Sequence, residues 1–231
     1  MLPLNDTEPN RYSHFPFMTI AIIWINVMVM GFEFIVLQES RDGFRQLLDL
    51  YGTVPALLLS SQGGGTLSSI TTMFLHGGLL HLFGNMLALW VFGRRVEDAC
   101  GPWGFLFFYL TCGFLANIAH VIFSADSVIP AIGASGAISG VMGAYLLLFP
   151  GGRIRTLVFL WIIPTWPKIR AFFIVIYFLI VNIIPALSVV LNNTDYNIAY
   201  WAHLGGFFAC FSVFFFLRPE AFQRYFSKAP V

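Results

Sequence analysis

Four polar side chains that could carry chemistry stand within apolar stretches of the sequence: His81, Asn85, Ser135 and His203. Polar groups at bilayer depth are costly and tend to mark functional sites. A serine becomes a nucleophile when a base such as histidine removes its proton. Because His81 and Asn85 are four residues apart, a helix places them on one face, where both can donate hydrogen bonds.

The sequence around Ser135 suits a nucleophile. Gly133 and Gly136 allow close backbone approach and unusual dihedral angles. An apolar helix follows directly, so its first N–H groups are free and the positive end of its dipole can stabilise an oxyanion. The alternative is a packing role, because small residues four apart, such as Gly136 and Gly140, also let membrane helices approach.

The composition indicates a membrane protein. Of 231 residues, 58% are hydrophobic and only 10% are charged, whereas soluble domains carry about 25% charged residues. The net charge of +1 gives no reason to expect nucleic acid as a partner. The three cysteines have no paired spacing, so neither a disulfide framework nor a metal site is expected.

The long apolar blocks predict an all-α, polytopic bundle of six transmembrane helices. The spans are placed near 17–38, 72–92, 103–123, 135–150, 170–191 and 200–217. The fourth is short: from Ser135 to Phe149 it covers about 22 Å, against roughly 30 Å of hydrocarbon. Its outer end, with Ser135, must therefore stop inside the membrane.

The basic residues predict the orientation. With six spans, ten of the twelve Lys and Arg fall on the side of the termini, and only Arg41 and Arg45 fall on the other. This bias predicts cytoplasmic termini. The first sixteen residues lack the pattern of a secretory signal, so the first span is expected to be retained. We expect a cytoplasmic segment 1–16, a six-span domain 17–217 and a cytoplasmic tail 218–231.

Topology alone brings the polar residues to one depth. Spans two, four and six all run from outside to inside, so His81, Ser135 and His203 share a level in the outer half of the membrane. No carboxylate lies within the spans at this level. A Ser–His dyad is therefore favoured over a triad, although Asp195 lies only eight residues before His203.

Two expectations concern the outer side. The loop 39–71 contains an amphipathic stretch that suits a helix in the membrane interface, and a flexible outer loop is the equal alternative. Glu33, near the outer end of the first span, is expected to reach the headgroups.

Three motifs resemble those of the rhomboid intramembrane serine proteases, bacterial type. They are HLFGN at 81–85, GASGAISG at 133–140 and AHLGG at 202–206, and FGRRVED at 92–98 and GPW at 101–103 add to the likeness. The resemblance, which spans about 15–217, implies a dyad with Ser135 as nucleophile and His203 as base. It also implies that His81, Asn85 and the Ser135 N–H bind the oxyanion, and we place Gly133 in the same site.

The resemblance further implies cleavage of transmembrane protein substrates near their outer ends, within the lipid bilayer and without a cofactor. The expected location is the cell (inner) membrane, with a cavity open to the extracytoplasmic side. Ser139 stands where an aromatic residue often packs on the catalytic histidine, so the orientation of His203 is left open. Glu97 is expected to be a structural acid and His76 a loop anchor. Oligomeric state is not indicated.

Other classes of membrane protein would require different residues. A metalloprotease would carry a His-Glu-x-x-His helix, and His76 and His81 are five apart. An aspartyl type would carry two aspartates within spans. A transporter would carry ionisable residues along a pathway, and only Glu33 is available. An inactive rhomboid-like binder of membrane helices usually lacks the serine or the histidine.

Overall fold

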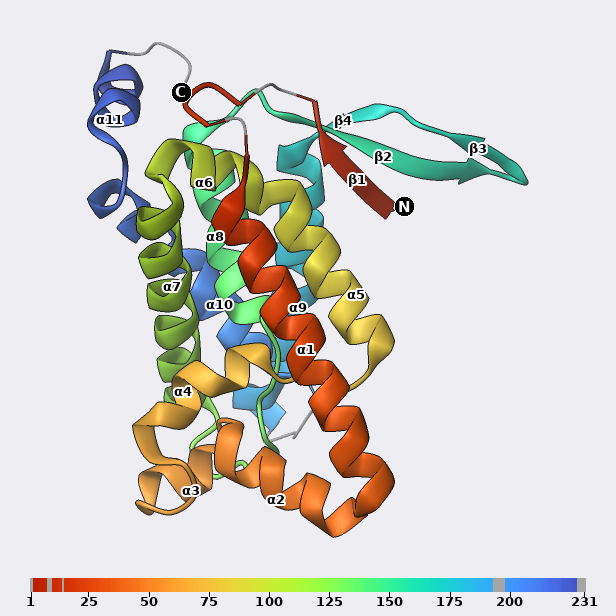
Figure 1. Cartoon of the computed structure of the whole chain (residues 1–231), viewed down its shortest axis with the longest axis vertical. Coiled ribbons are helices and arrows are strands. Elements are labelled where there is room, and N and C mark those ends of the chain that lie inside the picture. The colour runs from red at the N-terminus through yellow and green to blue at the C-terminus, as the bar shows by residue number, and fades with distance from the viewer. Residues whose placement is uncertain (1, 8–9, 14, 193–197, 228–231) are drawn as a thin grey trace.

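A computed structural model describes residues 2–7, 10–13, 15–192 and 198–227 of the chain (Figure 1). These residues are mostly helical, with a few strands at one end, which confirms the all-α polytopic class. Within them, three helices are long and apolar enough to cross a bilayer, namely Phe17–Glu39, Pro102–Phe123 and Ala171–Ser188. The count of six, which adds two bent helix pairs and one short helix, stays a prediction.

The elements follow one another along the chain as β1 (Leu2–Asp6), α1 (Phe17–Glu39), α2 (Arg41–Tyr51), α3 (Pro55–Leu59), α4 (Ser68–Thr71), α5 (Leu79–Ala88), α6 (Arg94–Cys100), α7 (Pro102–Phe123) and α8 (Ser135–Leu148). The second part contains β2 (Arg153–Leu160), β3 (Ile163–Thr165), β4 (Lys168–Arg170), α9 (Ala171–Asn192), α10 (Tyr200–Phe208) and α11 (Pro219–Phe226). The strands and α11 lie at one end of the bundle, called here the terminal end, and α2 and α3 lie at the far end (Figure 1).

The second predicted span begins and ends later than expected. The chain bends by 84° between Gly65–Phe74 and Leu79–Cys100, at a break that contains Gly78 with φ +150°. From Leu79 the helix continues through a π-helical turn to Cys100, so Arg94 and Arg95 are helical and not in a loop. Their charges are accommodated because the Arg94 side chain donates to a backbone carbonyl and Arg95 pairs with a carboxylate.

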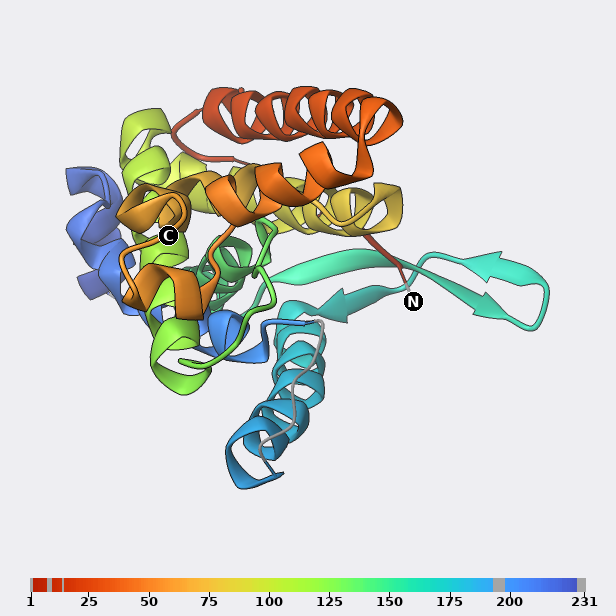
Figure 2. The same cartoon turned by 90° about the horizontal axis from the view of Figure 1, so that it is seen from below.

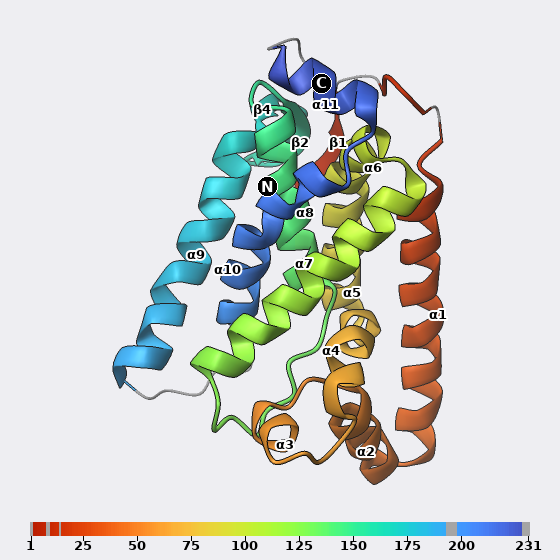
Figure 3. The same ribbon diagram turned by 90° about the vertical axis from the view of Figure 1, so that its left-hand side faces the viewer.

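The fourth and sixth predicted spans correspond to short helices in the structure. Helix α8 has only 14 residues, in agreement with the predicted short span, and it begins partway along the bundle (Figure 3). Helix α10 ends at Phe208 and a 3-10 helix, Ala209–Phe215, continues it before a bend of 104° into α11.

Glycines let α8 approach α7 and α10 closely. A Cβ atom at Gly136 would lie 2.8 Å from Ala116 Cβ, and one at Gly140 would lie 2.8 Å from the Gly206 carbonyl oxygen. A Cβ at Gly206 would collide with the carbonyl oxygen of Gly136. The small residues therefore have the packing role that was considered as the alternative. That role does not exclude a chemical role for Ser135, because the close contact of the helices also positions the serine.

The segment between α1 and α5 folds against the bundle. Helix α2 forms at the predicted amphipathic stretch, where Ser40 Oγ accepts the Gly43 N–H, and it lies across the far end (Figure 1). The expectation that Glu33 reaches the headgroups is wrong. Its side chain is 1% exposed, and both carboxylate oxygens accept the His76 N–H at 3.2 Å because the loop before α5 covers it.

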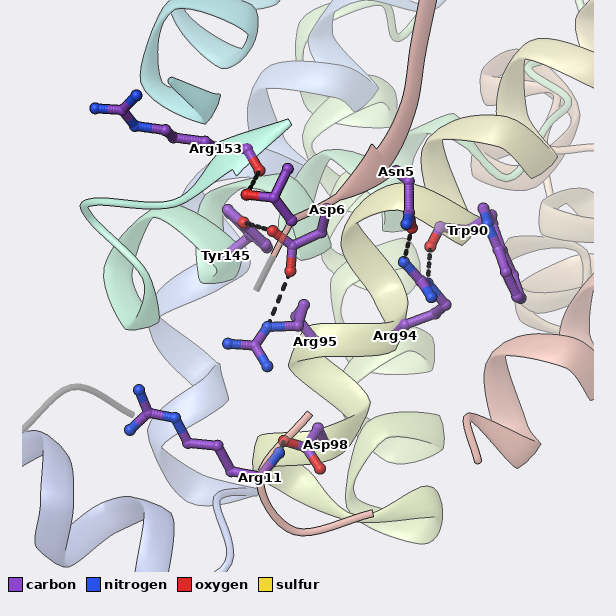
Figure 4. A network of polar contacts seen from close by, with 10 residues as sticks. Asn5, Asp6, Arg11, Trp90, Arg94, Arg95, Asp98, Tyr145 and Arg153 are labelled. Carbon is purple, nitrogen blue, oxygen red and sulfur yellow. Dashed lines mark hydrogen bonds and ion pairs between the residues drawn. The ribbon is translucent and has the colours of Figure 1, made fainter. Parts of the chain in front are cut away.

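The chain also contains a sheet that no sequence pattern indicated. Strand β2 pairs antiparallel with β1, β3 and β4, and this joins the N-terminal residues to the segment between α8 and α9. Figure 4 shows how β1 is fixed: Arg95 Nε lies 3.0 Å from Asp6 Oδ2, and the Tyr145 hydroxyl donates to Asp6 Oδ1 at 2.7 Å. Nearby, the Arg11 backbone N–H donates to Asp98 at 2.7 Å.

Glu97 has the structural role expected of it. Its carboxylate accepts hydrogen bonds from the Met18 N–H, the Thr19 N–H and the Thr19 hydroxyl, each at 2.7 Å. These are the first turns of α1, whose N–H groups have no partner within the helix. Glu97 therefore caps α1 and ties it to α6.

We expect Gly206→Ala to lower the free energy of unfolding by about 1–3 kcal/mol, because the added methyl group must separate α10 from α8. Thermal unfolding in detergent measures the change. The control is Gly31→Ala in α1, where a Cβ meets nothing within 4 Å. Equal stability of the two variants would contradict the close contact.

We expect Asp6→Ala to lower the free energy of unfolding by about 3 kcal/mol, because it removes the carboxylate from the buried guanidinium of Arg95. The same unfolding measurement applies, and the control on the same strand is Asn5→Ala, which removes only an exposed hydrogen bond from Arg94 and no buried charge. An Asp6→Ala protein as stable as the Asn5→Ala protein would show that the ion pair does not hold β1.

Candidate active site

The structure brings Ser135 and His203 together. Ser135 is the first residue of α8, and His203 lies in the first turn of α10. His203 Nε2 is 2.7 Å from Ser135 Oγ, which is hydrogen-bonding distance. The contact depends on the close approach of the two helices at Gly136 and Gly206 described above.

The tautomer of His203 follows from its other nitrogen. Nδ1 lies 2.5 Å from Asn182 Oδ1, and an amide oxygen can only accept, so Nδ1 carries the proton. The amide is held in this orientation because Asn182 Nδ2 donates to the Phe178 carbonyl at 2.7 Å. Nε2 of His203 is thus left as the acceptor that faces the serine hydroxyl.

Asn182 was not predicted from the sequence, although the sequence contains a signal for it. It is a polar residue within the apolar run of α9, the same criterion that singled out His81 and Ser135. Phe178, one turn earlier, packs its ring against His203 with centroids 5.6 Å apart. Ser139 stands where an aromatic residue was considered, and its hydroxyl donates to the Ser135 carbonyl at 2.7 Å. The aromatic contact of His203 is therefore made by Phe178 on α9.

Gly133, His81 and Asn85 surround one small space beside Ser135. A Cβ at Gly133 would lie 2.8 Å from His81 Nε2 and 3.4 Å from Asn85 Nδ2. The φ angle of Gly133 is +121°, a backbone conformation that favours glycine. Both this conformation and the short distances to His81 and Asn85 therefore require glycine at position 133.

Both side chains present donors to this space. The Gly77 N–H donates to His81 Nδ1 at 3.3 Å, so in the neutral ring the proton lies on Nε2. Asn85 Nδ2 is buried and has no acceptor among the residues that the structure describes. A buried donor without a partner is costly unless a ligand uses it. Two N–H donors beside a helix N-terminus can stabilise an oxyanion.

A cavity of about 660 Å³ opens beside this site, between α5 and α9. His81 and Asn85 line one side, Phe178 lines the other, and Ser135 and His203 lie between them. Pro3 of β1 also lines it. Figure 3 shows α9 leaning away from α10 toward the far end. The cavity is large enough for an extended peptide segment.

His76 contacts the His81 ring edge-on, with centroids 5.1 Å apart, and its backbone is held by Glu33, which fits a loop anchor. Asp195 lies outside the described residues.

The fold and the site together define a helical membrane protein with a serine and a histidine in hydrogen-bond contact. A family model described as the Rhomboid domain matches residues 64–220, which is more than half of the chain. The chain belongs to the rhomboid family.

Named relatives agree with this assignment. The chain is 43% identical over 84 residues to the rhomboid protease GluP of Bacillus subtilis, which is 36% of this chain and 16% of that protein. It is 32% identical over 128 residues to the putative rhomboid protease YdcA of the same organism, 55% of this chain and 57% of that protein. RHOMBOID-like protein 5 of Arabidopsis thaliana is 29% identical over 153 residues, 65% of this chain and 44% of that protein. The chain thus matches less than two thirds of the length of these relatives.

Proposed function

We propose that this chain is an intramembrane serine endopeptidase that hydrolyses peptide bonds in or near transmembrane segments of other membrane proteins. Membership of the rhomboid family supports protease function, although some homologues are inactive rhomboid-like proteins. The observation that carries the proposal is the 2.7 Å contact between Ser135 Oγ and His203 Nε2, with the proton of His203 on its far nitrogen.

In the proposed mechanism His203 Nε2 takes the hydroxyl proton as Ser135 Oγ attacks the peptide carbonyl carbon. The carbonyl oxygen becomes an anion beside Gly133. There the Nε2–H of His81, the Nδ2–H of Asn85 and the backbone N–H of Ser135 stabilise it. Asn182 accepts from Nδ1 of His203 throughout, and this keeps the ring oriented while it is charged.

Collapse of the tetrahedral intermediate breaks the peptide C–N bond, and His203 gives its proton to the leaving amine. Water then attacks the acyl-enzyme, with His203 as base again, and releases the new carboxylate and free Ser135. A second cavity of about 20 Å³ lies behind the serine and is lined by Asn117, Thr72 and Ser135, among others. It has room for one water molecule beside polar groups.

The substrate is proposed to enter laterally between α5 and α9. The cavity opens between these helices, and its lining is mainly apolar, which suits a peptide that comes from lipid. A peptide in a helix has its carbonyl hydrogen-bonded and its backbone shielded, so the cut site must unwind before Ser135 can reach it. Segments with weak helix propensity are the expected substrates.

We also propose the location and orientation. The protein is an integral membrane protein, and the cell membrane with both termini in the cytoplasm is the arrangement that the basic residues favour. Residues 17–217 are then the membrane domain, between the cytoplasmic segments 1–16 and 218–231. The active site opens toward the extracytoplasmic side, because Ser135 stands at the end of α8 that faces that side.

We expect Ser135→Ala and His203→Ala each to lower the rate of cleavage of a helix-destabilised transmembrane substrate at least about 10³-fold in reconstituted vesicles. The control is Ser212→Ala, whose hydroxyl donates to the Ala209 carbonyl and also contacts the Cys112 thiol. A fluorophosphonate probe should label the wild type at Ser135 and leave His203→Ala unlabelled. Cleavage that survives both substitutions would refute the dyad, and a wild type that neither cleaves nor reacts would be an inactive relative.

We expect Asn182→Leu to lower kcat about tenfold or more with little change in KM, because His203 loses the acceptor that fixes its tautomer. Asn182→Asp should retain more activity, since a carboxylate oxygen can also accept from Nδ1. Steady-state kinetics and the pH profile of kcat separate this positioning role from a loss of folding. A leucine variant with the wild-type kcat and pH profile would contradict it.

A further inference from the structure

The hairpin between α8 and α9 extends beyond the sheet that anchors it. Strand β1 pairs with β2 from Ile154 to Leu157, and β4 pairs with it from Arg153 to Arg155. From Val158 onward β2 has only β3 as a neighbour. Figures 1 and 2 show this part projecting sideways from the terminal end, away from the helices.

The projecting part carries large apolar side chains in the open. They are Phe159, Trp161, Ile162 and Ile163, called here the hairpin tip, and Trp161 is 97% and Ile162 91% exposed. In water a contiguous apolar patch of this kind favours aggregation, so it indicates a surface that meets another phase or partner. A two-stranded hairpin also has little stability of its own in water.

The turn itself is built from unfavourable residues. Trp161 and Ile162 connect Leu160 to Ile163, and Trp161 has φ +60°. Hairpin turns with positive φ strongly prefer glycine or asparagine, and a bulky residue there is strained. The turn therefore gives up local stability to keep a large aromatic side chain at its most exposed point.

Basic side chains surround the base of the same hairpin. Arg153 and Arg155 lie on β2, Lys168 and Arg170 lie on β4, and all four are exposed. Arg170 directly precedes α9, one of the helices long enough to cross a bilayer. The hairpin base thus lies where a spanning helix leaves the hydrocarbon, at the level of lipid headgroups.

We propose that the hairpin tip inserts into the headgroup and acyl-chain boundary of the surrounding bilayer, while its basic base binds anionic lipid phosphates. From Val158 to the turn at Trp161 the strand extends about 13 Å beyond its last pairing with β1, so the tip lies outside the protein's own perimeter, among lipids. Tryptophan is the side chain most typical of this boundary, and exposed basic residues add attraction to anionic headgroups.

The depth of the insertion is limited by the backbone. At the tip, each of the two strands has a neighbour on one side only, so the N–H and C=O groups on the other side need water or headgroups as partners. Hydrocarbon offers none. The hairpin therefore lies along the interface and does not cross it. A lipid surface suits the tip better than a peptide, because the bilayer is necessarily present around α9 and the hairpin projects away from the helices into it.

The test uses the full chain reconstituted in vesicles that contain phosphatidylglycerol. A nitroxide is attached to Ile162→Cys and, as a control, to Gly151→Cys, which lies in the exposed turn before β2 where a Cβ meets nothing within 4 Å. The three native cysteines are buried, and the parent protein treated with the same label gives the background. Power-saturation EPR then compares accessibility to oxygen and to a water-soluble nickel complex.

We expect an oxygen-to-nickel accessibility ratio several-fold higher at position 162 than at position 151, without any substrate. Equal ratios would overturn the proposal. A rise at 162 that occurs only after a transmembrane peptide is added would also overturn it, in favour of a peptide-docking surface. Neither readout depends on proteolysis, so the result is independent of the proposed catalytic function.

A second arm tests the headgroup charge. In the labelled Ile162→Cys background, the double change Arg155→Gln and Lys168→Gln should lower the ratio in phosphatidylglycerol vesicles and leave it unchanged in phosphatidylcholine alone. The matched control is Arg224→Gln on α11, which should change neither. If lipid charge and the double substitution have no effect, the assignment to anionic phosphates fails.

Discussion

Everything at the site depends on the close contact of α8 and α10 through glycine. Gly206 lies against the carbonyl of Gly136, one residue beyond Ser135, and neither position tolerates a side chain. Backbones that approach this closely allow a short serine hydroxyl and an imidazole from distant parts of the chain to meet at 2.7 Å. With ordinary side chains at this crossing the helices would separate, and the two groups would no longer share a proton.

The second layer of the site comes from α9. Asn182 accepts from His203 and Phe178 packs on its ring, so one helix provides both the hydrogen bond and the aromatic surface. This arrangement explains how the histidine can be held while Ser139 replaces the usual aromatic residue. Ser139 instead binds the backbone of the serine itself.

Much of the fold and of the candidate site could be predicted from the sequence, because hydropathy and short motifs carry the information. The short fourth span, and the shared depth of Ser135 and His203, follow from hydropathy and the parity of the spans. Asn182 was missed because one asparagine in an apolar run also suits helix packing, and its partner lies 21 residues away. Strand β1 was missed because it is short, contains Pro3 and pairs with residues about 150 positions distant. Glu33 was wrongly predicted to be exposed, because the loop before α5 buries it and the path of a loop cannot be predicted from sequence periodicity.

The location of Asn182 has a consequence for the timing of the reaction. The helix that bears it also forms one wall of the opening through which a substrate would arrive. If α9 tilts outward to admit a peptide, the amide withdraws from the imidazole, and the imidazole is then free to rotate or change tautomer. Under the proposed function, substrate entry and catalysis would then be mutually exclusive: the site would be inactive while α9 is open and would become active only after α9 has closed on the bound peptide.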